Sequence, residues 1–491
     1  MLGLPTKIWL AVCLLAAATA HADEDDTRLL LDQAGRQAQQ YRQSGWLEAD
    51  TDADKRSITI DGQTYAVGDS EEELAQGIFY ALNLRQWHKA AQFLPRYRAL
   101  PQHKPHLALM AEGLLARQEG DIAEALAKMQ AAHRAAPEDV RIRLELARLY
   151  TEDNQNKEAA AAFETVLDAE MPSETREVVQ GYLNNIRERS RWHGNISVGA
   201  GYNSNINQAN GKSECVARFE DQCLIQRNLP EAQNSPFWQY SAVLTKKTPL
   251  SGHHSLLLRP LAYGTKYLRD AEHSGEKESH SEHTAMLYGG YNYTDAGDDF
   301  SLLPYVEHYF RNGHTQYRAF GAEAAWARKL DEKWSANARA EAKRFHYAGG
   351  QKMYFDDYSQ YSAGAGAGYA FAPGAGVFAN LDLIRKKYPH AVSSSKEYVA
   401  RAGAYKLFEQ GFYLNAMLIY RYSRYDAESF IAGGARRSDR QTVWLAAVGA
   451  PKWQFKKIYP ELRFKHTVNR SNSDYYAYRQ NEVTLGLKYR F

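Results

Sequence analysis

The residue types that usually carry chemistry are sparse in this 491-residue chain, and their spacing argues against catalysis. His280 and His283 stand three apart, which places them on opposite faces of a strand and makes a shared metal unexpected. Gly364, Gly366 and Gly368 superficially resemble a phosphate-binding loop. They follow a period of two and open no helix, so the nucleotide interpretation fails. We therefore expect no enzyme, no cofactor and no metal site.

The glycines still call for a structural explanation. In a strand they would share one face, opposite Ala363, Ala365, Ala367 and Tyr369. Two interpretations stay open. A glycine lane facing a lumen would leave room for a plug, a loop or a passing chain, or glycine simply lets the strand bend.

The N-terminus predicts export. Lys7 precedes an apolar run at residues 8–18, and Ala20-His21-Ala22 follows it. A basic start, a short apolar region and an A-x-A site describe a secretory signal peptide, so we assign residues 1–22 to it. Cys13 lies inside the apolar region and is not interpreted as a lipidation site.

The mature chain would keep two cysteines, Cys215 and Cys223. Two nearby cysteines in an exported chain usually form a disulfide, and metal binding by the pair is the weaker interpretation. The formal net charge of +2 gives no case for nucleic-acid binding. The mean hydropathy of −0.58 excludes a bundle of apolar membrane helices but allows a transmembrane β-barrel, where only alternate residues face lipid.

Two regions with different periodicity follow the leader. Residues 23–70 form an N-terminal segment in which Asp61-Gly62 predicts a short hairpin. Residues 71–190 are rich in Ala, Leu, Glu and Arg at helical period and predict a periplasmic repeat domain that resembles a tetratricopeptide array. Small, bulky and proline positions recur at a spacing of 34, with Ala91 as the match in a degenerate first unit: Gly113, Ala125, Met129, Ala132 and Pro137, then Ala147, Ala159, Phe163, Val166 and Met171. A plain helical hairpin bundle is the alternative.

At about residue 192 the period changes from 3.6 to 2, and residues 191–491 predict an antiparallel barrel of about 14 strands. Connections alternate between short and long, as in outer-membrane barrels, except for a short outer turn at Asn312-Gly313. The expected strands are 192–203, 236–248, 254–269, 280–294, 300–311, 314–330, 334–347, 357–371, 376–388, 397–408, 411–425, 438–450, 457–469 and 479–491.

The last strand supplies a further signal for an outer membrane. Val483, Leu485, Leu487, Tyr489 and the terminal Phe491 share one face, a pattern that resembles the signal recognised by the barrel assembly machinery. Every backbone amide in hydrocarbon must pair, so the first strand must close on the last. Gly199, Gly201 and Gly486 lie in these two strands, which motivates the hypothesis of a weak seam between them.

The whole mature chain resembles the surface lipoprotein assembly modulator family of Neisseria and relatives. The resemblance rests on the segment Asn205-Ile206-Asn207-Gln208-Ala209 after the first strand, on Ile60-Asp61-Gly62 and on the domain order. It implies an outer-membrane protein that delivers lipidated clients, such as iron- or haem-acquisition receptors, to the cell surface. Partners would be the client, the bilayer, the assembly machinery and periplasmic chaperones. Asn205 and Asn207 are candidate client-contact residues, unless they only shape the turn.

The main alternative function is an exopolysaccharide export porin, since such exporters also join helical repeats to a barrel. Those proteins usually carry more repeats and a lumen of one charge, whereas this chain offers about three repeats and mixed charges. A passive porin would not need the repeats. A plug-type receptor would need a plug domain and an outer-membrane protease a convergent acid–histidine set, and we find neither.

Overall fold

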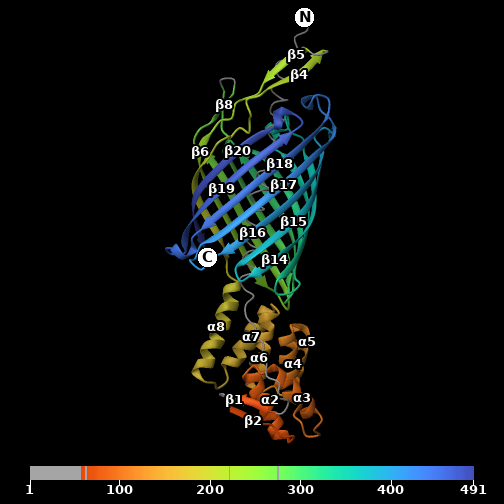
Figure 1. The fold of residues 1–491 in the computed structure, drawn as a ribbon, viewed down its shortest axis with the longest axis vertical. Coiled ribbons are helices and arrows are strands. Elements are labelled where there is room, and N and C mark those ends of the chain that lie inside the picture. The colour runs from red at the N-terminus through yellow and green to blue at the C-terminus, as the bar shows by residue number, and fades with distance from the viewer. Residues whose placement is uncertain (1–56, 61–62, 220–221, 274–275) are drawn as a thin grey trace.

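The computed structural model describes residues 57–60, 63–219, 222–273 and 276–491. The predicted signal peptide and the start of the N-terminal segment lie outside these residues. A helical domain stands below one end of a β-barrel, and the C-terminus lies at that same end (Figure 1). None of the helices in the described part of the chain is long and apolar enough to cross a membrane.

The helical domain begins with the two-stranded sheet of β1 (Ser57–Ile60) and β2 (Gln63–Ala66), paired antiparallel as a hairpin. Seven helices follow as three antiparallel pairs and a closing helix, and the tetratricopeptide-like prediction is confirmed. They are α2 (Glu71–Asn83), α3 (Trp87–Arg98), α4 (Pro105–Glu119), α5 (Ile122–Ala135), α6 (Val140–Glu152), α7 (Asn156–Leu167) and α8 (Ser173–Arg189).

Small side chains let the paired helices approach closely, as the repeat pattern predicts. Ala125 and Ala159 are fully buried at the α4–α5 and α6–α7 contacts. The prediction was wrong by one residue in the first repeat, where Ala91 is exposed and Ala90 is buried. The cause is a first unit of 35 residues, since α3 begins at 87 and α5 at 122, whereas α7 begins 34 residues later at 156.

Fourteen antiparallel strands then close into a barrel, and this prediction is confirmed. Each strand pairs with its neighbour in the chain, and the last closes on the first. The strands are β3 (His193–Asn203), β6 (Ser235–Pro249), β7 (His254–Tyr267), β10 (Glu282–Thr294), β11 (Asp298–Arg311), β12 (His314–Lys329), β13 (Trp334–Tyr347), β14 (Tyr358–Ala372), β15 (Ala375–Lys387), β16 (Ser395–Leu407), β17 (Tyr413–Glu428), β18 (Arg436–Gly449), β19 (Ile458–Ser471) and β20 (Tyr478–Arg490).

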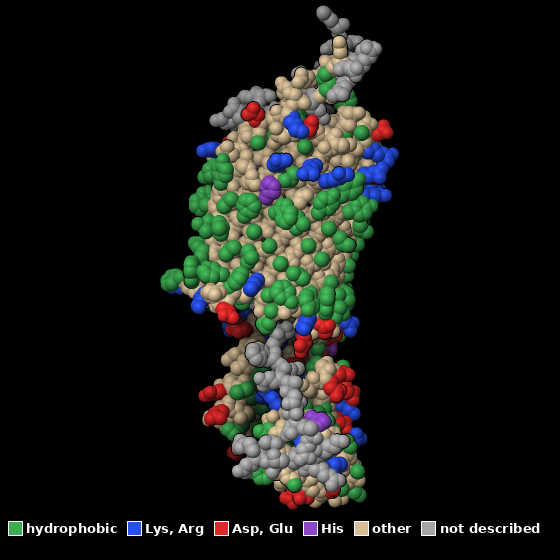
Figure 2. Space-filling model, in the orientation of Figure 1, with side chains coloured by type: hydrophobic (Ala, Val, Ile, Leu, Met, Phe, Trp, Pro, Cys, Tyr) green, Lys and Arg blue, Asp and Glu red, His purple; other side chains and the backbone are tan. Residues whose placement is uncertain are grey.

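The two faces of the wall differ in chemistry. Leu381 and Leu485 on the outside are 69% and 63% exposed, whereas the polar side chains next to them in sequence, Asp382 and Thr484, are each 3% exposed in the lumen. Figure 2 shows hydrophobic side chains spread over the middle of the outer wall. This pattern of apolar outside and polar inside is that of an outer-membrane barrel.

Two hairpins in the long outer loops were not predicted. β4 (Ser213–Phe219) pairs with β5 (Gln222–Asn228), and β8 (Ala271–His273) pairs with β9 (Glu276–Glu278). Figure 1 shows the β4–β5 hairpin projecting from the barrel end far from the helical domain. Both hairpins extend the loops rather than the barrel sheet.

Candidate functional site

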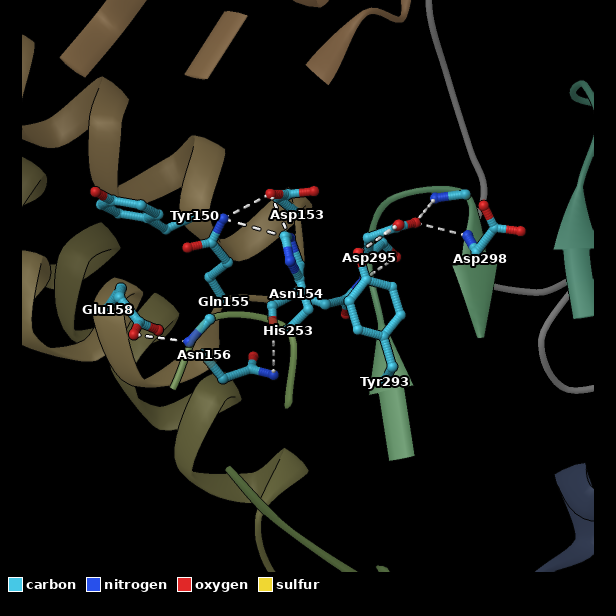
Figure 3. Close-up of polar contacts among 12 residues, drawn as sticks. Tyr150, Asp153, Asn154, Gln155, Asn156, Glu158, His253, Tyr293, Asp295 and Asp298 are labelled. Carbon is cyan, nitrogen blue, oxygen red and sulfur yellow. Dashed lines mark hydrogen bonds and ion pairs between the residues drawn. The ribbon is translucent and has the colours of Figure 1, made fainter. Parts of the chain in front are cut away.

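The helical domain meets the barrel through the turn between α6 and α7 (Figure 3). The Asn154 side-chain amide donates to the backbone oxygen of Asp295, in the β10–β11 turn, at 2.8 Å. The backbone N–H of Gly252, in the β6–β7 turn, donates to a Glu158 carboxylate oxygen at 2.8 Å. One helical turn therefore contacts two neighbouring barrel turns, and we call this contact the polar latch.

A histidine completes the latch. His253 Nε2 lies 2.7 Å from Asp153 Oδ2, and the Gln155 side-chain amide donates to the same oxygen at 2.7 Å. The His253 ring also packs 5.2 Å from that of Tyr293. The Asp153 carboxylate thus holds the barrel histidine and its own helical turn together.

The repeat geometry explains why Asn154 reaches the barrel. Each helix pair turns through a left-handed residue, with φ +57° at Arg85, +87° at Gly120 and +57° at Asn154. Glycine and asparagine tolerate this region best. In the last repeat the position is asparagine, and its side-chain amide donates to the barrel turn at Asp295.

Asp295 is fixed from its own turn. Its Oδ1 accepts the backbone N–H groups of Gly297 at 2.8 Å and Asp298 at 2.7 Å, and its Oδ2 accepts the Tyr293 hydroxyl at 3.1 Å. Partial burial opposes ionisation, but these donors outweigh it and hold the pKa of Asp295 below its usual value. The turn that receives Asn154 is therefore rigid and anionic at neutral pH.

The latch is small and polar, and its only covalent counterpart is the short link between α8 and β3. Small polar contacts between domains usually permit relative motion. Within the described residues, the covalent link and the hydrogen bonds of the polar latch thus both join the helical domain to the barrel.

Both ends of the long loop between β3 and β6, residues 204–212 and 229–234, lie at the far end of the lumen, and Asn207, Asn210 and Leu229 line a cavity there. Asn205 is buried, and its side chain hydrogen-bonds both backbone groups of Ala209 and donates to the Arg479 backbone oxygen at 2.8 Å. Asn207 spans the loop from the Glu231 oxygen to the Gln233 N–H. The two predicted asparagines therefore organise the loop.

Asn210 fastens the same loop to the last outer connection. Its side-chain amide donates to the backbone oxygens of Asp474 and Ala477, each at 2.6 Å, and Lys212 pairs with Asp474 at 2.7 Å. A cavity of about 110 Å³ remains between the loop and the lumen wall. Its lining includes Asn207, Asn210, Arg421, Arg437, Asp439 and Tyr476.

Cys215 and Cys223 lie in the β4–β5 hairpin. Cys215 and Cys223 form a disulfide with Cα atoms 5.7 Å apart. The bridge joins the two hairpin strands within the outer loop, and Figure 1 shows this hairpin at the barrel end opposite the helical domain.

The closing ladder between β3 and β20 contains nine residue pairs. The other thirteen ladders of the described barrel contain eleven to fourteen. Gly199 stands directly opposite Gly486, and Gly201 opposite Thr484. Cross-strand side-chain pairs stabilise sheets, so a glycine pair contributes little. A Cβ at Gly201 would lie 2.4 Å from Phe237 Cζ, so packing also requires that glycine.

Paired charges of both signs line the wall of the lumen. Asp382 on β15 contacts Arg339 on β13 at 2.9 Å and Arg401 on β16 at 2.5 Å. Lys343 pairs with Glu307 at 2.5 Å. Mutual pairing lets such charges be buried.

The glycines of β14 make room for these charged side chains. This role differs from both sequence interpretations, a free lane for a passing chain and a bend in the strand. Gly364, Gly366 and Gly368 face the lumen, but a Cβ at Gly364 would lie 2.1 Å from Asp382 Oδ1 and one at Gly366 2.0 Å from Asn380 Oδ1. The lane is thus occupied by side chains of the next strand, which cross it, and the Asp382 carboxylate reaches Arg339 over Gly364.

The geometry describes an outer-membrane barrel with a loop folded over its outer end and a helical domain hydrogen-bonded to its other end. A family profile described as "Surface lipoprotein assembly modifier" matches residues 192–491, and one for its N-terminal TPR repeats matches residues 63–163. The chain belongs to the surface lipoprotein assembly modifier family. The family is named for assembling surface lipoproteins, not for a catalysed reaction.

Relatives of this assembly modifier align over its whole length. A hemophilin secretion modulator of Acinetobacter baumannii is 28% identical, covering 97% of this chain and 98% of the relative. Surface lipoprotein assembly modifier 2 of Neisseria meningitidis serogroup B is 22% identical, covering 98% and 99%. Among solved structures, the outer membrane channel DcaP of A. baumannii shows 10% identity and a TM-score of 0.32 over 61% of this chain and 96% of its own. As in the family, this barrel lies in the outer membrane.

Proposed function

We propose that this assembly modifier delivers lipidated proteins of the iron- or haem-acquisition type from the periplasm to the cell surface. The observation that carries the proposal is full-length similarity to relatives named for surface lipoprotein assembly and hemophilin secretion. The helical domain at the inner mouth and the mixed charges of the lumen support a protein client over an anionic polysaccharide. Export would remove residues 1–22, and periplasmic chaperones and the barrel assembly machinery would act before insertion.

The helical domain would capture the client. Phe79, Tyr80 and Leu84, at the end of α2, are large apolar side chains that are each 43% exposed. Clustered exposed apolar groups on a soluble domain mark protein contact sites. The patch lies on the first helix pair, farther from the barrel than the α6–α7 turn of the polar latch (Figure 1).

The β3–β20 seam is the proposed route. It has the fewest pairs among the described barrel ladders and a glycine pair at Gly199 and Gly486, so separating it costs the least side-chain packing. A lateral opening lets the lipid chains of a client stay in the bilayer while its polypeptide passes the polar lumen. The Asn205 bond to Arg479 would close the outer end of this opening.

The delivery proposal is tested by deleting the protein and digesting intact cells with protease. Loss of one or more lipoproteins from the surface, with unchanged total amounts, is expected. If every lipoprotein stays exposed while a capsule or exopolysaccharide disappears, the chain is an exporter of polysaccharide.

The route is tested separately by a disulfide across the seam. Val198 and Leu487 are exposed and directly opposite each other, so V198C/L487C should block client display until reductant is added. The matched control L383C/Y398C staples two exposed, opposed residues of the β15–β16 ladder and should leave display intact. Unchanged display with the stapled seam rejects lateral opening but leaves delivery standing.

A further inference from the structure

Five exposed basic side chains face outward on adjacent strands near the outer end of the barrel. Figure 2 shows blue side chains crossing the upper wall above the hydrophobic region. The five, which we call the basic belt, are Lys396 on β16, Arg424 on β17, Arg440 on β18, Arg470 on β19 and Arg479 on β20. A neighbour of each in sequence faces the lumen and is buried. These neighbours are, in the same order, Glu397, Ser423, Asp439, Asn469 and Gln480.

The belt lies beyond an aromatic boundary on the same outward face. Tyr398 and Tyr422, whose rings stack 6.3 Å apart, stand two residues below Lys396 and Arg424. Trp444 stands four residues below Arg440 and is exposed. Aromatic side chains mark the edge of the hydrocarbon. At about 3.3 Å per residue along strands tilted by about 40°, the belt lies roughly 5–10 Å further out, among the head groups of the outer leaflet.

Within the protein, the belt charges repel one another. Lys396 is directly opposite Arg424, and Arg440 directly opposite Arg470. Like charges in opposed positions destabilise a sheet. No ion pair joins any of the five to a carboxylate in the described part of the chain. The adjacent outward-facing Arg385, in contrast, pairs with Asp426 at 2.8 Å.

We propose that the basic belt binds the phosphate groups of the phosphorylated glycolipid in the outer leaflet. Guanidinium groups match phosphate oxygens in bidentate geometry. Bound phosphates would sit between the opposed pairs and convert their repulsion into attraction. The belt ends on β20, so the ordered lipid would lie along one side of the closing seam.

The test uses the purified full-length protein in a neutral detergent. Native mass spectrometry would count retained lipid A with two phosphates against the dephosphorylated diglucosamine lipid. The test variant is R440Q/R470Q, and the control K452Q/K456Q removes the same charge from exposed lysines in the β18–β19 turn at the opposite rim. A basic residue near a head-group layer contributes about fivefold in binding, so the test variant, which lacks two such residues, should lose about 25-fold.

A second readout separates the belt from a general effect of charge. Without lipid, R440Q/R470Q should unfold at a temperature equal to or above that of the wild type, because the repulsion is gone. With phosphorylated lipid A, the order should reverse. The single variant R440Q gives the same test if the double variant does not fold, as judged by heat-modifiable gel migration. Equal retention of both lipids by the wild type, equal losses in test and control variants, or no reversal would overturn the proposal.

Discussion

Replacing Gly364 with alanine tests how the barrel holds its lumen charges. The new Cβ would lie 2.1 Å from Asp382 Oδ1 and 2.8 Å from the Leu381 backbone oxygen. Ordinary contacts begin near 3.4 Å, so the carboxylate must move by about 1 Å or more and lose its 2.9 Å contact with Arg339. A hydrogen bond between charged groups contributes about 1.5–3 kcal/mol. Because Arg339 stays partly in contact with water, we expect a value in the lower half of this range, a loss of about 2 kcal/mol in the free energy of unfolding.

Urea unfolding in detergent, followed by heat-modifiable gel migration, measures this loss. Gly289→Ala is the control, because its Cβ would meet only Leu258 Cδ1 at 3.5 Å. A double-mutant cycle gives the decisive result. If Gly364 makes room for Asp382, the cost of Gly364→Ala should fall in a D382A background and keep only the part due to the Leu381 backbone oxygen. Equal cost in both backgrounds would show that Asp382 is not the reason for glycine at this position.

Three further predictions concern the latch and the loop. Asn154→Gly keeps the left-handed turn but removes the 2.8 Å bond to Asp295, so it should lower client display by surface labelling while barrel unfolding stays unchanged. The control Lys157→Ala, at an exposed position at the start of α7, keeps that bond. Asn205→Ala leaves the buried partners at Ala209 and Arg479 unsatisfied, so barrel stability should fall by about 1–3 kcal/mol in urea, and a neutral result would refute its role as a clamp. The pKa of Asp295 is lowered in the folded protein. Its carboxylate therefore stabilises the fold above the unfolded pKa of about 3.9, and this stabilisation is lost as the pH falls through the folded pKa. Protease cleavage between the domains should rise only below about pH 4, and cleavage of D295N should not change with pH.

Regular periodicity made the architecture predictable. Alternating apolar residues from 192 onward and the face shared by Val483, Leu485 and Leu487 define strands without any knowledge of their partners. The repeats were equally clear, and the one error, Ala91 for Ala90, came from a single extra residue in the first unit. Short-range sequence patterns were therefore enough to predict the helices and strands, because residues close in sequence determine these elements.

Contacts between distant residues were the part that sequence could not supply. The Asp382 side chain lies over Gly364 because the register of β14 and β15 places the two residues opposite each other. No pattern within either strand predicts that register. The latch joins Asn154 to Asp295, 141 positions away. The basic belt was predictable from sequence. Arg424, Arg440 and Arg470 all occupy outward-facing positions near the outer ends of the predicted strands.

Reconstitution tests the central claim most directly. Purified full-length protein in sealed proteoliposomes, with a lipidated client loaded on the side of the helical domain, should expose the client to external protease without nucleotide or ion gradient. The same vesicles with the V198C/L487C staple should expose it only after reduction. If the client stays protected in vesicles that contain the wild-type protein, the chain does not itself move lipoproteins across the bilayer.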